Sequence, residues 1–428
     1  MEQISFREKI NALNTKIFMP LMALTFILFN TVINLYIGER METIQNMLAV
    51  VILAVLAFWR ISDIKDGLMP WLRQNILVIC YFAVRAVSCV LSGFDYTVIR
   101  SIFFEAFFLI GMCRITLGNR RDFYIKAFIA LELLFSAASL ILYCFNHATG
   151  GSIETFLNNC TYYEISGSAL LYANPNTAGI MAGFSIVLAI VLYGKNGYDK
   201  RFVLLFGIFN VAALVIFGCR SADVGILFIL AVMAVQKYFN CKKKTAVFFS
   251  LCLMVLTLIP IYGLIQYNES IEHLSYTEIE AAADRFSSGR YTLWKECIIV
   301  QKDNPVFGIG SLNLEQQARE DMMNSLEKRW EYSYRYFSSI ELGPHNGYIA
   351  QISATGWAGF AFFIAILAQK IKRADHLNRG RWYLLVIYTL VINCFESLFI
   401  LNRFFTCFYM LLILETDMEQ QDEPKKLK

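Results

Sequence analysis

Long apolar stretches follow one another along this chain, and they leave few folds open to it. Each is close to the roughly 20 residues that an α-helix needs to cross the hydrocarbon core of a bilayer. Only 17% of the residues are charged, against about 25% in a soluble domain. The sequence therefore predicts an all-α fold, a polytopic membrane bundle of about 12 transmembrane helices. To within several residues, the expected spans are 17–37, 43–59, 75–93, 97–115, 125–145, 168–194, 201–217, 222–240, 245–265, 346–369, 382–398 and 401–415.

Lysine and arginine residues gather in every second connection between these stretches. With the N-terminus inside the cell, the short outer connections hold only Arg40, Arg220 and Arg403, and the outer segment 146–167 holds neither residue type. Because basic residues favour cytoplasmic loops, we expect a protein of the cytoplasmic (inner) membrane with both termini in the cytoplasm. The basic residues of the inner connections are Arg60, Lys65, Arg73, Arg114, Arg120, Arg121, Lys126, Lys195, Lys200, Arg201, Lys237, Lys242, Lys243, Lys244, Lys370, Lys372, Arg373, Arg379 and Arg381.

This topology leaves one large loop outside the membrane. The expected helices 1 to 9 occupy 1–265, the loop 266–345, helices 10 to 12 346–416, and a cytoplasmic tail 417–428. A structureless loop of that length is uncommon, so it should contain helices of its own. One is predicted from Arg290 to Val300, where apolar residues recur every three or four positions.

The composition argues against two other classes of function. The formal net charge of +4 is too small to indicate nucleic-acid binding. Most of the 11 cysteines lie inside apolar stretches, where they act as small apolar side chains, and no CxxC pair occurs. We therefore expect no metal site, no redox framework and no cofactor.

Three side chains beside the large loop suit a phosphate-bearing substrate and proton transfer. Arg290 begins the predicted loop helix and Arg220 lies in a very short outer turn; guanidinium groups bind phosphate oxygens in a bidentate manner. His345 lies where the loop meets the next apolar stretch, and an imidazole accepts protons near neutral pH. Plain alternatives are a solvated Arg290 paired with Asp284 or Glu296, an Arg220 that reaches to the interface, and a His345 bonded to a backbone carbonyl.

Two asparagines are secondary candidates for the site. Asn174 and Asn176 flank Pro175 near the outer end of the expected span 168–194. Proline interrupts the hydrogen bonds of a helix, and amide side chains can satisfy the freed groups. Broken helices at membrane depth line cavities, although packing of small residues is an equal alternative.

Charged residues within the spans are the remaining candidates. Arg85 and Glu105 occupy matching depths in adjacent spans, which favours a structural ion pair. Glu396, near the outer end of the expected span 382–398, is a candidate for a second acidic group at the site. Glu132 is harder to interpret from the sequence.

Four patches resemble the O-antigen ligase and polysaccharide polymerase superfamily, which includes O-antigen and capsular polysaccharide polymerases. The likeness extends in layout from Ser168 to Glu415, with one large outer loop between the second and last patches. The family often has a serine where this chain has Cys219. The patches are Asn174-Pro175-Asn176, Cys219-Arg220-Ser221-Ala222, Arg290 to Trp294 with Pro305 to Gly310, and His345-Asn346 with Thr355-Gly356-Trp357-Ala358-Gly359.

The resemblance implies a fold like that of GT-C type glycosyltransferases and a metal-independent, inverting glycosyl transfer outside the cytoplasmic membrane. The donor is expected to be an oligosaccharide on undecaprenyl diphosphate, held by Arg220 and Arg290 through its diphosphate. His345 is expected to accept or orient the proton of the acceptor hydroxyl. Membrane lipid, chain-length regulator proteins and flippase proteins are the implied partners in building a capsule or exopolysaccharide.

Three functions remain open at this point. A polymerase joins lipid-linked repeat units, whereas a ligase moves the finished glycan to another acceptor, classically lipid A-core. We favour the polymerase because nothing in the sequence ties the chain to an outer-membrane acceptor. A flippase or transporter of lipid-linked oligosaccharide is the third reading, but the chain has no two-half repeat and transporters seldom carry so large an outer loop.

Overall fold

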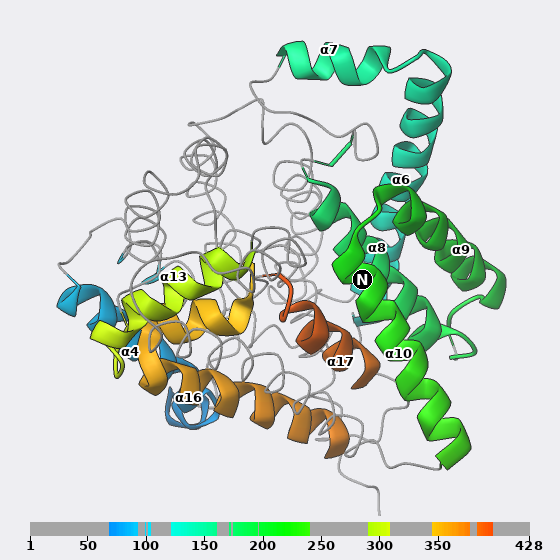
Figure 1. Ribbon diagram of the computed structural model, residues 1–428. Helices are drawn as coiled ribbons and strands as arrows, with labels where there is room; N and C mark the ends of the chain where they lie inside the picture. Colours follow the sequence, from blue (N-terminus) through cyan, green and yellow to red (C-terminus); the bar gives the residue numbers. More distant parts are fainter. Residues whose placement is uncertain are drawn as a thin grey trace, which may run out of the picture.

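The computed structural model describes residues 68–92, 99, 102–103, 121–160, 171–172, 174–195, 197–239, 290–308, 345–376 and 383–396. These residues are almost wholly α-helical (Figure 1). The helices are α4 (Leu68–Leu91), α6 (Arg121–Ala148), α7 (Ser152–Cys160), α8 (Pro175–Leu192), α9 (Lys200–Phe217), α10 (Arg220–Phe239), α13 (Arg290–Asp303), α16 (Gly347–His376) and α17 (Tyr383–Ile392).

Several of these helices have the length and composition of membrane spans. Among the described residues, five segments are long and apolar enough to cross a bilayer, so the expected class, a multi-pass helical membrane protein, is confirmed. The count of about 12 spans and the likeness to GT-C enzymes stay predictions. The five segments are Phe128–Ala148, Pro175–Leu192, Lys200–Phe217, Arg220–Tyr238 and Gly347–Gln369. The expected spans 17–37, 43–59, 245–265 and 401–415, most of 97–115 and of the loop 266–345, and the tail lie outside the described residues.

The direction of the helices separates two ends of the bundle. The thiol of Cys219, between α9 and α10, bonds the carbonyl of Asn176 at the start of α8. The start of α8, the end of α9 and the start of α10 therefore lie together. Basic residues mark the opposite end, where the Nζ atom of Lys126 lies 5.5 Å from the ring centroid of Tyr198. The other basic residues at that end are Lys195, Lys200, Arg201 and Lys237.

Two apolar cores meet at the end of α17. The larger core joins α6, α8, α9, α10 and α17, and almost every residue of α8 from Ala178 onward is buried. The smaller core packs α4 against α16. Phe395, just after α17, packs against both cores. Figure 1 shows α17 between the α8–α10 group and the group of α4, α13 and α16.

Helix α16 is broken at Gly356, a feature that the sequence analysis did not anticipate. Gly356 has φ 63° and ψ −170°, a conformation that glycine adopts readily and other residues do not. The amides of Trp357 and Ala358 donate to the carbonyls of Pro305 (2.9 Å) and Val306 (3.1 Å). The turn that follows α13 thus replaces the helical partners that the break removes.

This exchange of hydrogen bonds ties α13 to the first half of α16. The hydroxyl of Ser353 also donates to the carbonyl of Cys297 on α13 (2.9 Å). The two segments run side by side in the same direction (Figure 1). Their N-terminal ends therefore lie close together, and these ends carry Arg290 and His345.

The Gly356→Ala substitution is expected to lower the free energy of unfolding by about 3 kcal/mol. A Cβ atom at this position would lie 2.3 Å from the carbonyl carbon and oxygen of Val306. Gly194→Ala is the matched control, because Gly194 also has a positive φ but a Cβ there would meet nothing within 4 Å. Denaturant unfolding of the detergent-purified variants measures both changes, and equal losses would contradict the proposed clash.

One expectation from the sequence is wrong, and another stays a prediction. Pro175 does not interrupt a helix: it is the first residue of α8, where proline's missing N–H leaves no helical bond unmade. Arg85 is buried on α4, with its guanidinium carbon 5.8 Å from the ring centroids of both Tyr81 and Phe82. Its expected partner, Glu105, lies outside the described residues.

Candidate functional site

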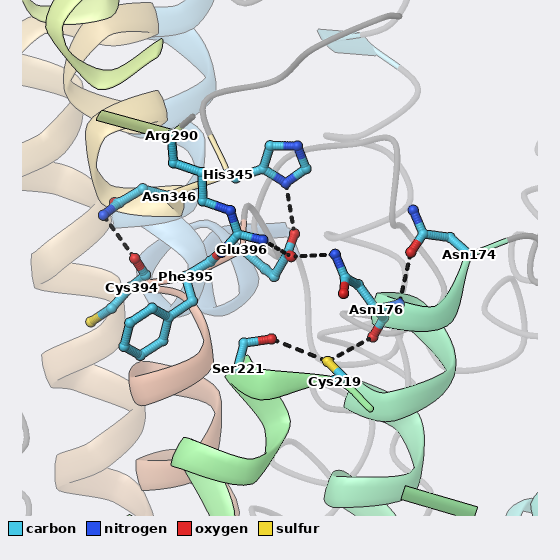
Figure 2. Close-up of polar contacts among 10 residues, drawn as sticks. All are labelled: Asn174, Asn176, Cys219, Ser221, Arg290, His345, Asn346, Cys394, Phe395 and Glu396. Atoms are coloured by element: carbon cyan, nitrogen blue, oxygen red, sulfur yellow. Dashed lines mark hydrogen bonds and ion pairs between the residues drawn. The ribbon is translucent and has the colours of Figure 1, made fainter. Parts of the chain in front are cut away.

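Glu396 lies at the centre of a polar cluster where the two cores meet. Helix α17 ends at Ile392, and the turn that follows places the Glu396 side chain fully inside the protein, at 0% exposure. Its carboxylate accepts hydrogen bonds from the side chains of Arg290 (3.0 Å) and Asn176 (3.2 Å) at Oε1 and contacts His345 at Oε2 (3.0 Å). Figure 2 shows these three partners around the carboxylate. A buried carboxylate requires such partners, because an uncompensated one is costly to desolvate.

Arg290 is the first residue of α13, as the sequence predicted. One guanidinium nitrogen donates to the carbonyl of Phe395 (2.9 Å) and the other to Glu396. These two hydrogen bonds fix the plane of the guanidinium group. The side chain remains 22% exposed, so part of the group faces outward. Arg290 is therefore held by Glu396 rather than standing as a solvated surface arginine.

His345 occupies a strained position directly before α16. Its φ of 45° lies in the left-handed region, which non-glycine residues seldom occupy. Its neighbour Asn346 caps α16 by accepting the amides of Tyr348 and Ile349, both at 3.0 Å. The strained backbone turns the His345 ring toward Glu396, where its Nδ1 atom lies 3.0 Å from Oε2. Such strain persists only where its surroundings hold it, and it is common at functional sites.

The two candidate asparagines have different tasks at the start of α8. The Asn174 side chain caps the helix by accepting the amide of Asn176 (2.7 Å). The Asn176 side chain points the other way and donates to Glu396. The sequence placed both residues at the site, and the structure assigns the helix cap to one and the link to the acidic group to the other.

Cys219 and Arg220 approach the cluster from the turn between α9 and α10. The Cys219 thiol is buried beneath Asn176, and its sulfur lies 3.2 Å from the Ser221 hydroxyl. Burial raises the pKa of this thiol, and the negative charge of Glu396 contributes to the rise. A thiol that stays protonated keeps its hydrogen for the Asn176 carbonyl. Arg220 follows as the first residue of α10, and its side chain is exposed.

Four helix N-termini converge on this cluster. Helices α8, α10, α13 and α16 begin at or within two residues of Asn176, Arg220, Arg290 and His345, respectively. Each helix N-terminus carries roughly half a positive charge from its peptide dipoles. The caps of α8 and α16 use several of the free amides themselves, so these two helices act through their dipoles more than through direct donation. Together with two arginines, these helix dipoles supply more positive charge than the carboxylate of Glu396 neutralises. The arrangement therefore favours the binding of a further anion.

The structure brings together most of the residues that the sequence proposed. Arg290, His345 and Asn176 contact Glu396 directly, and Asn174 caps the helix that carries Asn176. Arg220 follows Cys219, whose thiol bonds the Asn176 carbonyl. Arg85 is instead buried beside the rings of Tyr81 and Phe82 on its own helix, α4. The sequence analysis missed the carbonyl of Phe395 as the second partner of Arg290, and only the tertiary fold reveals it.

Comparison with known proteins points to a function for this segment. Residues 202–364 match the family model described as O-antigen ligase. The matched segment contains Arg220, Arg290 and His345, but not Asn176 or Glu396. No curated protein matches the chain.

Proposed function

We propose that this chain, whose residues 202–364 match the O-antigen ligase family model and so support an O-antigen ligase-like superfamily, joins oligosaccharide repeat units carried on undecaprenyl diphosphate. The superfamily implies a glycosyltransferase-like enzyme of the ligase or polymerase kind, acting on lipid-linked oligosaccharide in a membrane. The observation that carries the finer proposal is the cluster of Arg290, His345 and Glu396 at the convergence of four helix N-termini.

The cationic side of the cluster suits a diphosphate leaving group. A guanidinium group has five N–H donors, and Arg290 uses two of them on Phe395 and Glu396. The other three have no partner among the described residues and are proposed to bind phosphate oxygens, and Arg220, exposed at the start of α10, is proposed to supply a second guanidinium group. As the bond from the sugar to the diphosphate breaks, negative charge grows on the phosphate oxygens, and these groups stabilise it. The same stabilisation requires no metal ion.

The imidazole supplies the proton acceptor. A carboxylate oxygen accepts a hydrogen bond, so Glu396 favours the tautomer of His345 that carries its hydrogen on Nδ1. The Nε2 atom is then free to take the proton of the acceptor hydroxyl. In this mechanism the hydroxyl oxygen attacks the anomeric carbon, and the electron pair of the old bond leaves with the diphosphate. A single displacement of this kind inverts the configuration at the anomeric carbon.

The reaction is proposed to occur on the outer side of the cytoplasmic membrane. The site lies at the end of the bundle opposite the basic residues Lys126, Lys195, Lys200 and Lys237. Basic residues favour the cytoplasmic side, which supports an outward-facing site and a cytoplasmic N-terminus. The expected division into a first group of helices, an outer loop and a last group of helices belongs to the same proposal.

The polymerase and the ligase differ in their acceptor, and one reconstituted assay separates them. Purified protein in proteoliposomes is given lipid-linked repeat units extracted from the membranes of a strain that lacks this protein. A ladder of longer lipid-linked glycans is expected from these repeats alone. Product that forms only after lipid A-core is added would instead support the ligase. Movement of the repeats across the bilayer without a new glycosidic bond would support a transporter and overturn both.

A further inference from the structure

A buried polar cluster outside the proposed site connects two segments that contribute to it. We call these segments the two arms: one is the start of α8, with Asn176, and the other is the turn from α9 into α10, with Cys219 and Arg220. Glu132, on the membrane-spanning helix α6, is 1% exposed. The hydroxyl of Tyr172 donates to its two carboxyl oxygens at 3.2 and 3.4 Å. Ser136, one turn further along α6, contacts Glu132 at 3.4 Å and donates to Asn210 of α9 at 3.0 Å. Burying polar side chains inside a membrane bundle costs free energy, so a cluster of them indicates a functional role.

Tyr172 holds a position between the two arms of the site. It is fully buried and lies two residues before Asn174, the cap of α8. Its ring packs edge to face on Phe217, with centroids 5.6 Å apart, and Phe217 lies two residues before Cys219. One aromatic ring thus touches the end of α9 while its own backbone leads into α8.

The two arms are also in direct contact with each other. A Cβ atom added at Gly179, on the second turn of α8, would lie 2.1 Å from the Cβ atom of Cys219. The thiol of Cys219 bonds the carbonyl of Asn176. A displacement of Tyr172 would therefore shift Asn176 and the start of α10 together.

We propose that Glu132 and Tyr172 are positioning residues that hold the arm with Asn176 and the arm with Arg220 in place for the lipid-linked donor. The proposal rests on the proposed function, because it assigns these two arms to donor binding. Neither residue contacts Glu396 or its partners directly among the hydrogen bonds of the described residues. Their effect is transmitted through the Tyr172 ring and through the chain from Tyr172 to Asn176.

Four variants of the full-length protein test this role. Tyr172→Phe removes only the hydroxyl and keeps the ring against Phe217 and Phe135. Glu132→Leu removes the acceptor at similar size, whereas Glu132→Gln keeps an oxygen that can accept from Tyr172. Ser139→Ala is the matched control, because Ser139 is buried on the same helix and its hydroxyl has no hydrogen-bond partner among the described residues.

The first measurement is transfer in proteoliposomes at increasing concentrations of the lipid-linked repeats. Tyr172→Phe and Glu132→Leu are expected to raise KM for the donor about tenfold with little change in kcat. Glu132→Gln and Ser139→Ala are expected to stay near wild type. An unchanged KM, with activity falling only in proportion to the amount of folded protein, would show a purely structural role and overturn the proposal.

The second measurement does not depend on the reaction. Cys219 is 1% exposed in the intact protein, so its alkylation, followed by peptide mass spectrometry, reports on the position of the two arms. Faster labelling is expected in Tyr172→Phe and Glu132→Leu only. If no variant or wild type transfers sugar but this labelling pattern appears, the proposed function fails and the anchoring role stands. Wild-type labelling in Tyr172→Phe and Glu132→Leu would overturn the anchoring role.

Discussion

The Glu396→Gln variant is expected to lose glycosyl transfer by roughly 10²- to 10⁴-fold in kcat, the effect of replacing an imidazole-orienting carboxylate by its amide. The carboxylate accepts from Arg290 and Asn176 at one oxygen and faces His345 at the other. An amide that keeps its oxygen toward Arg290 must turn its NH₂ group toward the imidazole. The Nδ1 atom then has to accept, so the hydrogen moves to Nε2 and the proton acceptor is lost.

Glu132→Gln is the control for this prediction, since it makes the same chemical change at another buried carboxyl group of the bundle. We expect that variant to keep its activity. The rate of polymer formation in proteoliposomes measures both variants, with the amount of folded protein matched. Equal activity of Glu396→Gln and wild type would exclude Glu396 as the residue that orients His345.

The Arg290→Ala variant is expected to lower the rate of transfer by roughly 10²- to 10³-fold, the loss typical of removing one group that stabilises charge in a transition state. The substitution removes the guanidinium group proposed to bind the diphosphate and leaves the buried Glu396 without its arginine partner. Arg290→Lys is expected to restore little activity. A single ammonium group cannot reproduce the paired donation to the Phe395 carbonyl and Glu396 while also presenting donors outward.

Lys302→Ala serves as the control for Arg290, because it removes a positive charge from the opposite end of the same helix. Cells that carry each variant in place of the wild-type protein are compared for polymer length and for lipid-linked single repeats. We expect single repeats to accumulate only with the Arg290 variants. Polymer of normal length in Arg290→Ala cells would remove this residue from the proposed site.

Much of the fold could be predicted because its signals are local. An apolar run of membrane length predicts a span wherever it occurs, and α6, α9 and α10 follow their expected ranges closely. The start of α13 at Arg290 also follows from nearby residues. The start of α8 did not, because proline was taken to interrupt a longer helix; Asn174 and Pro175 are in fact its cap and first residue.

The site could be predicted only as a set of candidates. Arg290, Arg220 and His345 can be identified in the sequence because charged or titratable residues beside apolar stretches often have a function. For Glu396, the sequence showed only a charged residue at a suitable depth in an expected span. Its central position depends on the turn after α17, and its partner Asn176 is 220 positions away in the chain. Rules of periodicity and spacing describe residues close in sequence, so they cannot predict a contact over such a separation.

The sequence by itself determined that this chain is a multi-pass helical membrane protein with arginine and histidine side chains at the ends of its apolar stretches, residue types that suit phosphate binding and proton transfer. Hydrophobicity, capping and charge act within a few residues, so they can be seen in the sequence. Only the tertiary structure decided that four helix N-termini meet at one buried carboxylate, and that the break at Gly356 ties α13 to α16. Both depend on the packing of segments distant in the chain, where backbone groups freed in one helix find their partners in another.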